Sequence, residues 1–366
     1  MLFKIKREDI FTNLQSMVNI IEKKQTIPIL SDVFIKTNVD YLDVIGTDLE
    51  IQLSAKVAAD ITRQGETTIS ARKFFDICRN LPDNSDFTLE LKEEHAYIRS
   101  GRSRFRLATR NPKNFPEFST DEYKIDLKIE NRKLLNILRS TNFCMATHDV
   151  RYYLNGLMIE IDSSHIGAVA SNGHRLAMYN EKLDTLMDID ARFIIPRKGV
   201  MELLRLLGSN SDKMVGLRVS NSNIEISLDE KIFLSKLIDG KFPDFKSALS
   251  QPIGHNFILK TMEFKNSLSR VSILSSEKFK KITLKFLNDI LLIRTDNNEQ
   301  EQADEEIDID YHGEGYEISL NISYLLEAIS NIHHEKVEIS FTENTNICLI
   351  SIPKEYNLNY VIMPLV

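Results

Sequence analysis

A strand-like run that turns into an amphipathic helix occurs three times in this 366-residue chain, at residues 68–82, 193–207 and 317–332. In the middle copy the break falls at Pro196, and the apolar residues that follow are spaced i, i+3, i+4 and i+7, as on one buried helical face. The residues with this spacing are Val200, Leu203, Leu204 and Leu207, matched by Phe74, Ile77, Cys78 and Leu81 and by Leu325, Ala328, Ile329 and Ile332. A module that returns at roughly one third of the chain length predicts three copies of one domain.

The opposite helical face is basic in the first two copies and has no basic residue in the third. The basic residues are Arg72 and Arg79, then Lys198 and Arg205; Ser323, Glu327 and Ser330 occupy the third copy. The net charge of -7 argues against nucleic acid as a partner, but the charge is unevenly distributed. Residues 296–310 hold eight carboxylates without a Lys or Arg, whereas four helical segments carry excess basic charge. A solvated face is the alternative explanation for any one of these helices.

Each third of the chain follows the order strand, helix, strands, strand, helix, strands, which predicts an α+β fold with two helices on one face of antiparallel sheets. The boundaries fall near residues 121–124 and 250–254, giving domains at 1–122, 123–250 and 251–366. Each third also has a polar turn after an apolar strand, and we treat these turns as equivalent: Thr47 with Asp48, Ser171 with Asn172, and Thr295 with Asp296. Repeats joined without a linker should stack so that equivalent faces share one side.

Composition places the chain among globular proteins, with 42% hydrophobic and 27% charged residues. No apolar segment is long enough to cross a bilayer and the N-terminus resembles no signal peptide, so we expect a cytoplasmic protein without membrane association. Cys78, Cys144 and Cys348 form an odd set without CxxC spacing, which favours reduced thiols over disulfides or a zinc site.

Seven sequence runs, in order along the whole chain, resemble the bacterial DNA polymerase III β subunit family, the replication sliding clamps. The runs are GTDLE (46–50), ARKFFDICR (71–79), SGRSRF (100–105), DVRYYLNG (149–156), NGHRLA (172–177), PRKGV (196–200) and ILSSEKF (273–279). The resemblance implies a non-catalytic processivity factor without cofactors, loaded on duplex DNA by an ATP-driven clamp loader. It also implies a head-to-tail dimer of three-domain subunits that forms a ring with its helices around the DNA.

The resemblance assigns three sets of residues. We expect the basic helix fronts to face DNA, and the family adds four further positions, so the expected DNA-facing set is Lys24, Arg72, Arg79, His148, Tyr152, Tyr153, Lys198 and Arg205. Core or sheet positions are the alternative for the two tyrosines. Phosphate contacts by such residues would be sensitive to salt and independent of sequence.

The second implied set is a pocket for short linear peptides from the polymerase III catalytic subunit, other DNA polymerases, the clamp loader, ligase and mismatch-repair proteins. Its residues are Leu154, Ser171, Gly173, His174, Arg175, Leu176, Pro243, Phe279, Asn321, Tyr324, Val361, Met363 and Pro364. Ser247 and Ala248 stand where the family has larger residues, and the tail is a short MPLV. The pocket should persist with an altered preference among peptides.

The third implied set is the contact between two copies of the chain. Lys73, Phe105 and Leu107 belong to one surface, and Ile273, Leu274, Glu299, Glu301, Glu305 and Glu306 belong to the other. Apolar residues surrounded by opposite charges suit an interface that is stable but can be opened. For several of the carboxylates, a solvated loop is the alternative.

The residues do not favour catalysis. His333 and His334 are adjacent and so are poor joint metal ligands, and His148 with Asp149 lacks an accompanying nucleophile motif or phosphate loop. We therefore expect neither enzymatic activity nor a metal site. The competing classes are a nucleic-acid enzyme built from repeats and a scaffold that binds only proteins.

Overall fold

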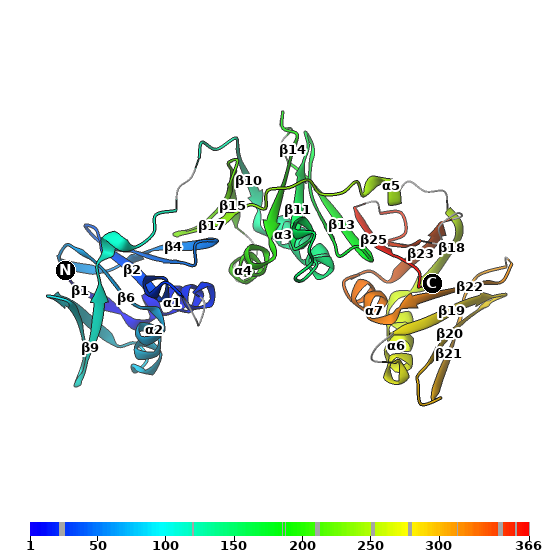
Figure 1. Ribbon diagram of the computed structural model, residues 1–366, viewed down its shortest axis with the longest axis horizontal. Coiled ribbons are helices and arrows are strands. Elements are labelled where there is room, and N and C mark those ends of the chain that lie inside the picture. The colour runs from blue at the N-terminus through cyan, green and yellow to red at the C-terminus, as the bar shows by residue number, and fades with distance from the viewer. Residues whose placement is uncertain are drawn as a thin grey trace. The chain divides into compact units, whose positions relative to one another are not determined.

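The computed structural model describes residues 1–21, 26–118, 121–184, 186, 188–208, 213–249, 253–276, 280–312, 314–342, 347–355 and 357–365. Figure 1 shows the helices and strands of the chain, which divides into two compact units. Unit 1 comprises Met1–Leu135 with Lys198–Ile238, and unit 2 comprises Asn136–Arg197 with Asp239–Val366. No helix within the described residues is both long and apolar enough to cross a membrane.

Unit 1 contains a sheet of thirteen strands in the order β10-β15-β16-β17-β4-β3-β2-β6-β9-β8-β7-β1-β5. The strands are β1 (Leu2–Lys6), β2 (Asp32–Thr37), β3 (Tyr41–Thr47), β4 (Ile51–Ala58), β5 (Asp60–Arg63), β6 (Glu66–Ser70), β7 (Asp86–Lys92), β8 (His95–Ser100), β9 (Ser103–Arg110), β10 (Ile125–Glu130), β15 (Met214–Val219), β16 (Asn223–Leu228) and β17 (Lys231–Lys236). Its helices are α1 (Arg7–Ile20), α2 (Ala71–Asn80) and α4 (Arg197–Leu207). Helix α1 packs on α2 and on β3 and β4, burying Ile10, Leu14 and Met17.

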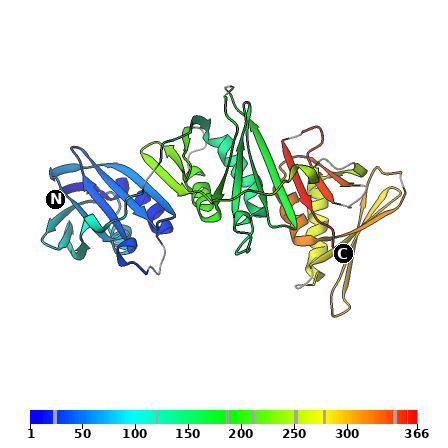
Figure 2. The same cartoon turned by 45° about the horizontal axis from the view of Figure 1, so that its top comes forward.

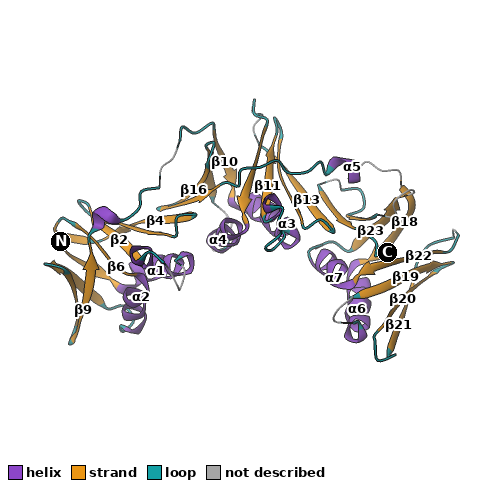
Figure 3. Cartoon of the chain, viewed as in Figure 1, coloured by secondary structure: helices purple, strands orange, loops and turns teal. Residues whose placement is uncertain are grey.

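Unit 2 contains an eight-stranded sheet, β14-β11-β12-β13-β25-β24-β23-β18, and a four-stranded sheet, β21-β20-β19-β22. The strands are β11 (Gly156–Ile161), β12 (His165–Ser171), β13 (Arg175–Lys182), β14 (Ala191–Pro196), β18 (Ile253–Lys260), β19 (Lys281–Leu287), β20 (Ile290–Asp296), β21 (Gln302–Asp308), β22 (Tyr316–Asn321), β23 (Lys336–Thr342), β24 (Cys348–Ser351) and β25 (Leu358–Ile362). The helices include α3 (Asn131–Thr141), which begins in unit 1, α5 (Lys246–Leu249), α6 (Thr261–Val271) and α7 (Ile322–Ser330). Helices α6 and α7 lie side by side against the four-stranded sheet (Figure 3).

The predicted repeat is present in the secondary structure. In the described part of the chain a strand leads directly into a helix six times, as β1-α1, β6-α2, β10-α3, β14-α4, β18-α6 and β22-α7. In the middle copy the strand ends at Pro196 and the helix begins at Arg197, because proline is tolerated where no intrahelical N–H is needed. Val200, Leu203 and Leu207 are buried as their spacing predicts, while Leu204 is half-buried.

Two strand pairings cross from one repeat to the next, so the compact units do not coincide with the repeats. Strand β17 of the middle repeat pairs antiparallel with β4 of the first, from Lys231 opposite Ala55 to Ser235 opposite Ile51. Strand β25 of the last repeat pairs with β13 of the middle one in the same way, and the two run side by side in Figure 2, green beside red. In both cases the pairing joins the final strand of one repeat to the strand after the polar turn of the preceding repeat.

The polar turns are equivalent in the first two repeats and shifted in the third. Asp48 Oδ1 accepts hydrogen bonds from the backbone N–H groups two and three residues later, and Asn172 Oδ1 does the same. In the third repeat Asn297, not Asp296, fills this role, accepting from the N–H groups two and four residues later. The prediction that Thr295 and Asp296 are the third pair was therefore wrong by one residue, because this turn is one residue longer and Asp296 pairs with Gln302.

Candidate nucleic-acid and peptide interfaces

The basic front of α2 is exposed and only partly neutralised. Ser70 caps the helix by accepting a hydrogen bond from the Lys73 N–H, and Phe74 and Cys78 are buried behind it. Arg79 forms an ion pair with Asp76 at 3.0 Å, and its guanidinium lies 5.5 Å from the centre of the Phe75 ring. Arg72 is exposed and has no ion pair within the described residues. Among the described residues, the front of α2 therefore presents Arg72 without an ion pair and Arg79 paired with Asp76.

Both predicted basic residues of α4 have carboxylate partners. Lys198 forms an ion pair with Asp48, whose side chain is only 3% exposed, so the turn of the first repeat is joined to the helix of the second. Arg205 is exposed and pairs with Glu202 one turn earlier. Burial raises the pKa of Glu202, and the positive charges of Arg205 and Lys198 oppose that rise. The sequence pattern did not predict that Glu202 would be buried.

The segment that contains the predicted His148, Tyr152 and Tyr153 is a well-bonded loop. His148 is exposed and has a positive φ of 57°, and Tyr152 is 58% exposed with its ring 6.0 Å from that of half-buried Tyr153. The alternative of a core position therefore does not apply to Tyr152. Lys24 lies outside the described residues.

An aspartate and an arginine that the predicted set did not include hold this loop in place. Arg151 donates through its backbone N–H, Nε and a terminal nitrogen to Asp149, at 2.9, 3.0 and 2.9 Å. Asn155 and Asp149 exchange two further hydrogen bonds. A Cβ on Gly173 would come within 2.7 Å of the Arg151 guanidinium, so the loop packs tightly on the polar turn of the middle repeat.

Arg175 is the centre of the predicted peptide site. Its side chain is only 9% exposed, donates to Glu327 at 2.7 Å and to the Phe143 carbonyl at 2.6 Å, and lies 4.3 Å from the centre of the Tyr324 ring. The Arg175 Nε atom is buried without a partner among the described residues. Asn321 caps α7 by accepting from the N–H groups of Ser323 and Tyr324, which fixes the start of that helix beside Arg175.

The tail of the chain joins the same site. The Met363 N–H donates to the His174 carbonyl at 2.9 Å, and Leu176 lies opposite Val361 in the β13–β25 ladder. Leu154, Leu176 and Val361 are buried, whereas Met363 is 41% exposed. Of the other predicted residues, Ser171 and Gly173 belong to the turn before β13, and Pro364 follows Met363. Pro243 lies in the 240–246 segment. Phe279 and the side chain of Ala248 lie outside the described residues. Phe143 and Glu327 were not predicted because both are far from Arg175 in sequence and contact it only in the folded chain.

Two strand edges carry four of the nine residues predicted for the contact between copies, Phe105 and Leu107 on β9 and Glu305 and Glu306 on β21. Among the described residues, β21 pairs only with β20, and β9 pairs with β6 only at Thr109 and Arg110, so the side of residues 103–108 that faces away from β8 has no strand partner there. Phe105 and Leu107 are half-buried and Ile273 is 77% exposed, as expected for residues that a second molecule could cover. Glu305 is already paired with Arg270. Lys73, Leu274, Glu299, Glu301 and Glu306 are at exposed or half-buried positions.

The described residues do not suggest catalysis by a metal. No group of three or more His, Cys, Asp or Glu side chains within them is placed to hold an ion. His333 and His334 are exposed. The features that remain are three related α+β repeats with helices of partly basic character, a buried arginine beside α7 and, among the described residues, two strand edges with an unpaired side.

Comparison with known proteins assigns this architecture. The sequence matches the N-terminal, central and C-terminal domains of the DNA polymerase III beta subunit over residues 1–119, 128–244 and 249–366. The beta sliding clamp of Pseudomonas aeruginosa is 36% identical over 366 residues, covering 100% of both chains. Two solved structures from that organism each match with a TM-score of 0.96 at 35% identity, and both matches cover 100% of this chain. One is the DNA polymerase III subunit beta, of which 100% is covered, and the other is a DnaN sliding clamp bound to griselimycin, of which 99% is covered.

The fold and these matches define a DNA sliding clamp, a non-catalytic processivity factor for a replicative polymerase. The chain belongs to the DNA polymerase III beta subunit family. Three tandem clamp domains, as predicted from the repeat, are confirmed. The individual DNA, peptide and dimer residues stay predictions.

The Asp149–Arg151 pair generates a prediction about pH. Hydrogen bonds from Arg151 lower the pKa of Asp149 to about 2. Because the folded-state pKa lies below the usual value of about 3.9, the pair stabilises the loop above that value and is lost as the pH falls toward 2. Carboxyl ¹³C NMR should show Asp149 titrating near pH 2 and, in Arg151→Ala, returning toward 4. The prediction fails if Asp149 titrates near 4 in the unaltered protein.

Proposed function

We propose that two copies of this clamp form a closed head-to-tail ring by pairing β9 of one copy with β21 of the other. The observation that carries the proposal is the rule obeyed by the two pairings between repeats. In each, the last strand of one repeat pairs with the strand after the polar turn of the preceding repeat. Strand β21 is the post-turn strand of the third repeat and β9 is the last strand of the first, and both have open edges.

The same rule gives the register of the proposed contact. By their positions in the last strand of each repeat, Phe105, Phe233 and Tyr360 are equivalent. Phe233 lies opposite Leu53, and Tyr360 lies opposite Ala177. Since Ala303 occupies the corresponding position of β21, Phe105 should lie opposite Ala303. Because the two strands would be antiparallel, this register also places Arg104 opposite Asp304 and Leu107 opposite Glu301.

Charge supports this contact. Residues 102–106 of the first repeat include three arginines, and β21 contains Asp304, Glu305, Glu306 and Asp308. Opposite charges along two strand edges align them and discourage pairing of either edge with itself. Apolar Phe105 and Leu107 then contribute burial between the charged rims.

We further propose that duplex DNA passes through the ring along the predicted residues of α2, α4 and the 148–153 loop. Cations on helices attract phosphate irrespective of base sequence, and the ring supplies a topological tether. The segment around Arg175 and Tyr324 would receive short peptides from the polymerase III catalytic subunit, other DNA polymerases, the clamp loader, ligase and mismatch-repair proteins. Buried apolar Leu176 and Val361 beside half-exposed Met363 would suit an extended peptide that inserts apolar side chains.

A charge exchange tests the ring contact. Arg104→Asp and Asp304→Arg should each weaken dimerisation by at least about tenfold because like charges then face each other, and the double variant should recover most of the loss. Sedimentation equilibrium measures the dissociation constant. Arg63→Asp, an exposed change on β5, serves as the control and should leave it unchanged. Equal dimerisation by all four proteins, or no recovery in the double variant, would exclude the proposed register.

Loading on circular DNA tests the proposed DNA path. With a clamp loader and ATP, the protein should remain on nicked circular DNA and leave after linearisation. Replacing Arg72, Arg79, Lys198 and Arg205 by Gln should lower loading several-fold at low salt and less at high salt, because screening already weakens these contacts. Unchanged loading would argue against this path. Failure of retention on circles would favour a protein-only scaffold, and metal-dependent cleavage would favour a nucleic-acid enzyme.

Griselimycin, present in one related clamp structure, gives a probe for the peptide site. Tyr324→Ala removes the ring that stacks on Arg175, so affinity measured by calorimetry should fall about tenfold, the factor expected for a desolvated cation–π contact and its packing. Tyr97→Ala, a half-buried tyrosine of the first repeat, should bind as the unaltered protein does. Equal affinity of Tyr324→Ala would place the ligand elsewhere.

A further inference from the structure

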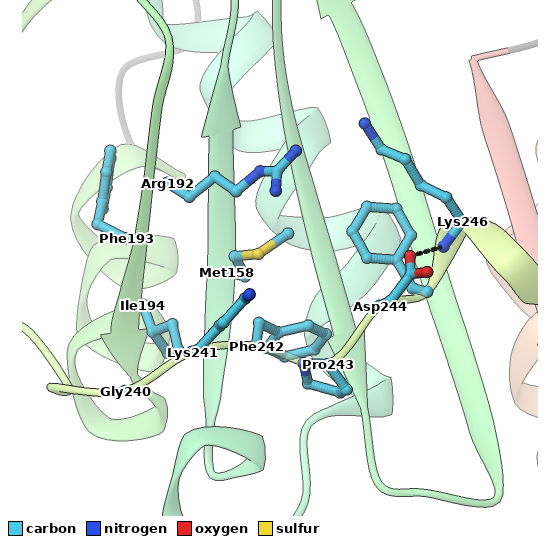
Figure 4. A pocket seen from close by; sticks show the side chains of 11 residues that line it. Met158, Arg192, Phe193, Ile194, Gly240, Lys241, Phe242, Pro243, Asp244 and Lys246 are labelled. Carbon is cyan, nitrogen blue, oxygen red and sulfur yellow. Dashed lines mark hydrogen bonds between the residues drawn. The ribbon is translucent and has the colours of Figure 1, made fainter.

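A cavity of about 440 Å³ lies in unit 2 between the 240–246 segment and strands β11 and β14 (Figure 4). Met158 and Ile194 line it from the strands, and Phe242 and Phe245 line it from the segment. All four side chains are at least nine-tenths buried, which anchors the segment to the sheet and keeps the cavity open. Of the described residues predicted for the peptide site, only Pro243 lines this cavity.

The cavity and the predicted peptide site share one face of the eight-stranded sheet. Residues directly opposite each other in a ladder point to the same face, as do residues two apart along a strand. Ile194 lies opposite Met158, Met158 opposite Val169, and Val169 opposite Met178. Two residues before Met178 on β13 is Leu176, which lies opposite Val361. Met158 of the cavity floor and Leu176 are thus two strands apart, about 10 Å across the sheet, and two residues apart, about 7 Å along the strands.

The cavity has an apolar floor and a rim with one cation in excess. Glu160 is shared by Arg192 at 2.9 Å and Lys246 at 3.2 Å. Asp244 accepts the backbone N–H of Lys246 at 3.0 Å, the bond drawn in Figure 4. Lys241 is exposed and has no hydrogen bond or ion pair within the described part of the chain. A carboxylate beside an apolar group would complement this arrangement.

We propose that the cavity is a second anchoring pocket for partner peptides, which receives an apolar side chain flanked by acidic residues. The inference rests on the proposed peptide site, because the occupant is the continuation of a peptide bound near Arg175 and Leu176. The shared sheet face and Pro243 make the two sites continuous, and the unpaired Lys241 selects the acidic flank. Because Phe242 and Phe245 already hold the cavity open, binding requires little rearrangement.

Peptide extension tests the proposal. The probe is a fluorescein-labelled peptide of alternating leucine and serine ending in phenylalanine, used alone or lengthened at either end by glycine, phenylalanine and two aspartates. Fluorescence anisotropy with the full-length protein should show about tenfold tighter binding for one of the extended forms, since the added phenylalanine and carboxylates both gain contacts. The same extension with two lysines in place of the aspartates should lose most of that gain.

Two variants locate the effect in the cavity. Lys241→Glu, an exposed change, should make the extended peptide bind no more tightly than the peptide without the extension. Ile194→Phe should have the same effect because the larger side chain fills the floor of the cavity. Both should bind the core peptide as before, which also verifies that they are folded. Lys128→Glu, an exposed lysine on β10, should keep the full ratio. If the core peptide binds but no extension tightens it, or the gain survives in Lys241→Glu, the cavity proposal is overturned and the peptide site stands. If no peptide binds, both are overturned.

Discussion

Backbone hydrogen bonding between neighbouring repeats is the interaction on which the rest of this clamp depends. The β4–β17 and β13–β25 ladders make one continuous sheet out of strands from two repeats. Their first bonds beyond the strands are also alike, from Lys236 N–H to the Glu50 carbonyl and from Met363 N–H to the His174 carbonyl, both at 2.9 Å. Open strand edges invite pairing with another chain. The described edges of β9 and β21 lack such a partner along most of their length, which supports the proposal that a second copy of the chain pairs with them.

These ladders also bring the polar turns to the helices of the following repeat. The first turn reaches α4 through Asp48 and Lys198, and the second reaches α7 through Arg175 and Glu327. The polarity of the two ion pairs is reversed, since the turn supplies the carboxylate in one and the cation in the other. The backbone arrangement is thus common to both contacts, while the side chains have diverged. In the second contact the cation is Arg175, the buried arginine of the proposed peptide site.

The repeat, the helices and their buried faces could be predicted because they depend on residues close in sequence. Spacing of apolar residues located α4, and Pro196 located its start. The third turn was misplaced by one residue because polar residues are plentiful there, and only the ladder shows that Asn297 is the hydrogen-bond acceptor. The carboxylate partner of Arg205 was predictable because Glu202 is three residues away on the same helix. The partner of Lys198 was not, because Asp48 is 150 positions away in the sequence.

That partial neutralisation bears on how a clamp can hold DNA without stopping on it. A cation with a carboxylate partner must give up part of that attraction to bind a phosphate, so its net contribution is smaller than that of a free cation. With α4 paired at both Lys198 and Arg205 and α7 lacking cations, the proposed DNA path offers few strong phosphate contacts. Weak contacts are sufficient when closure of the ring prevents escape, and strong ones would only slow sliding. The strand pairing proposed to close the ring would therefore allow the helices to bind DNA weakly.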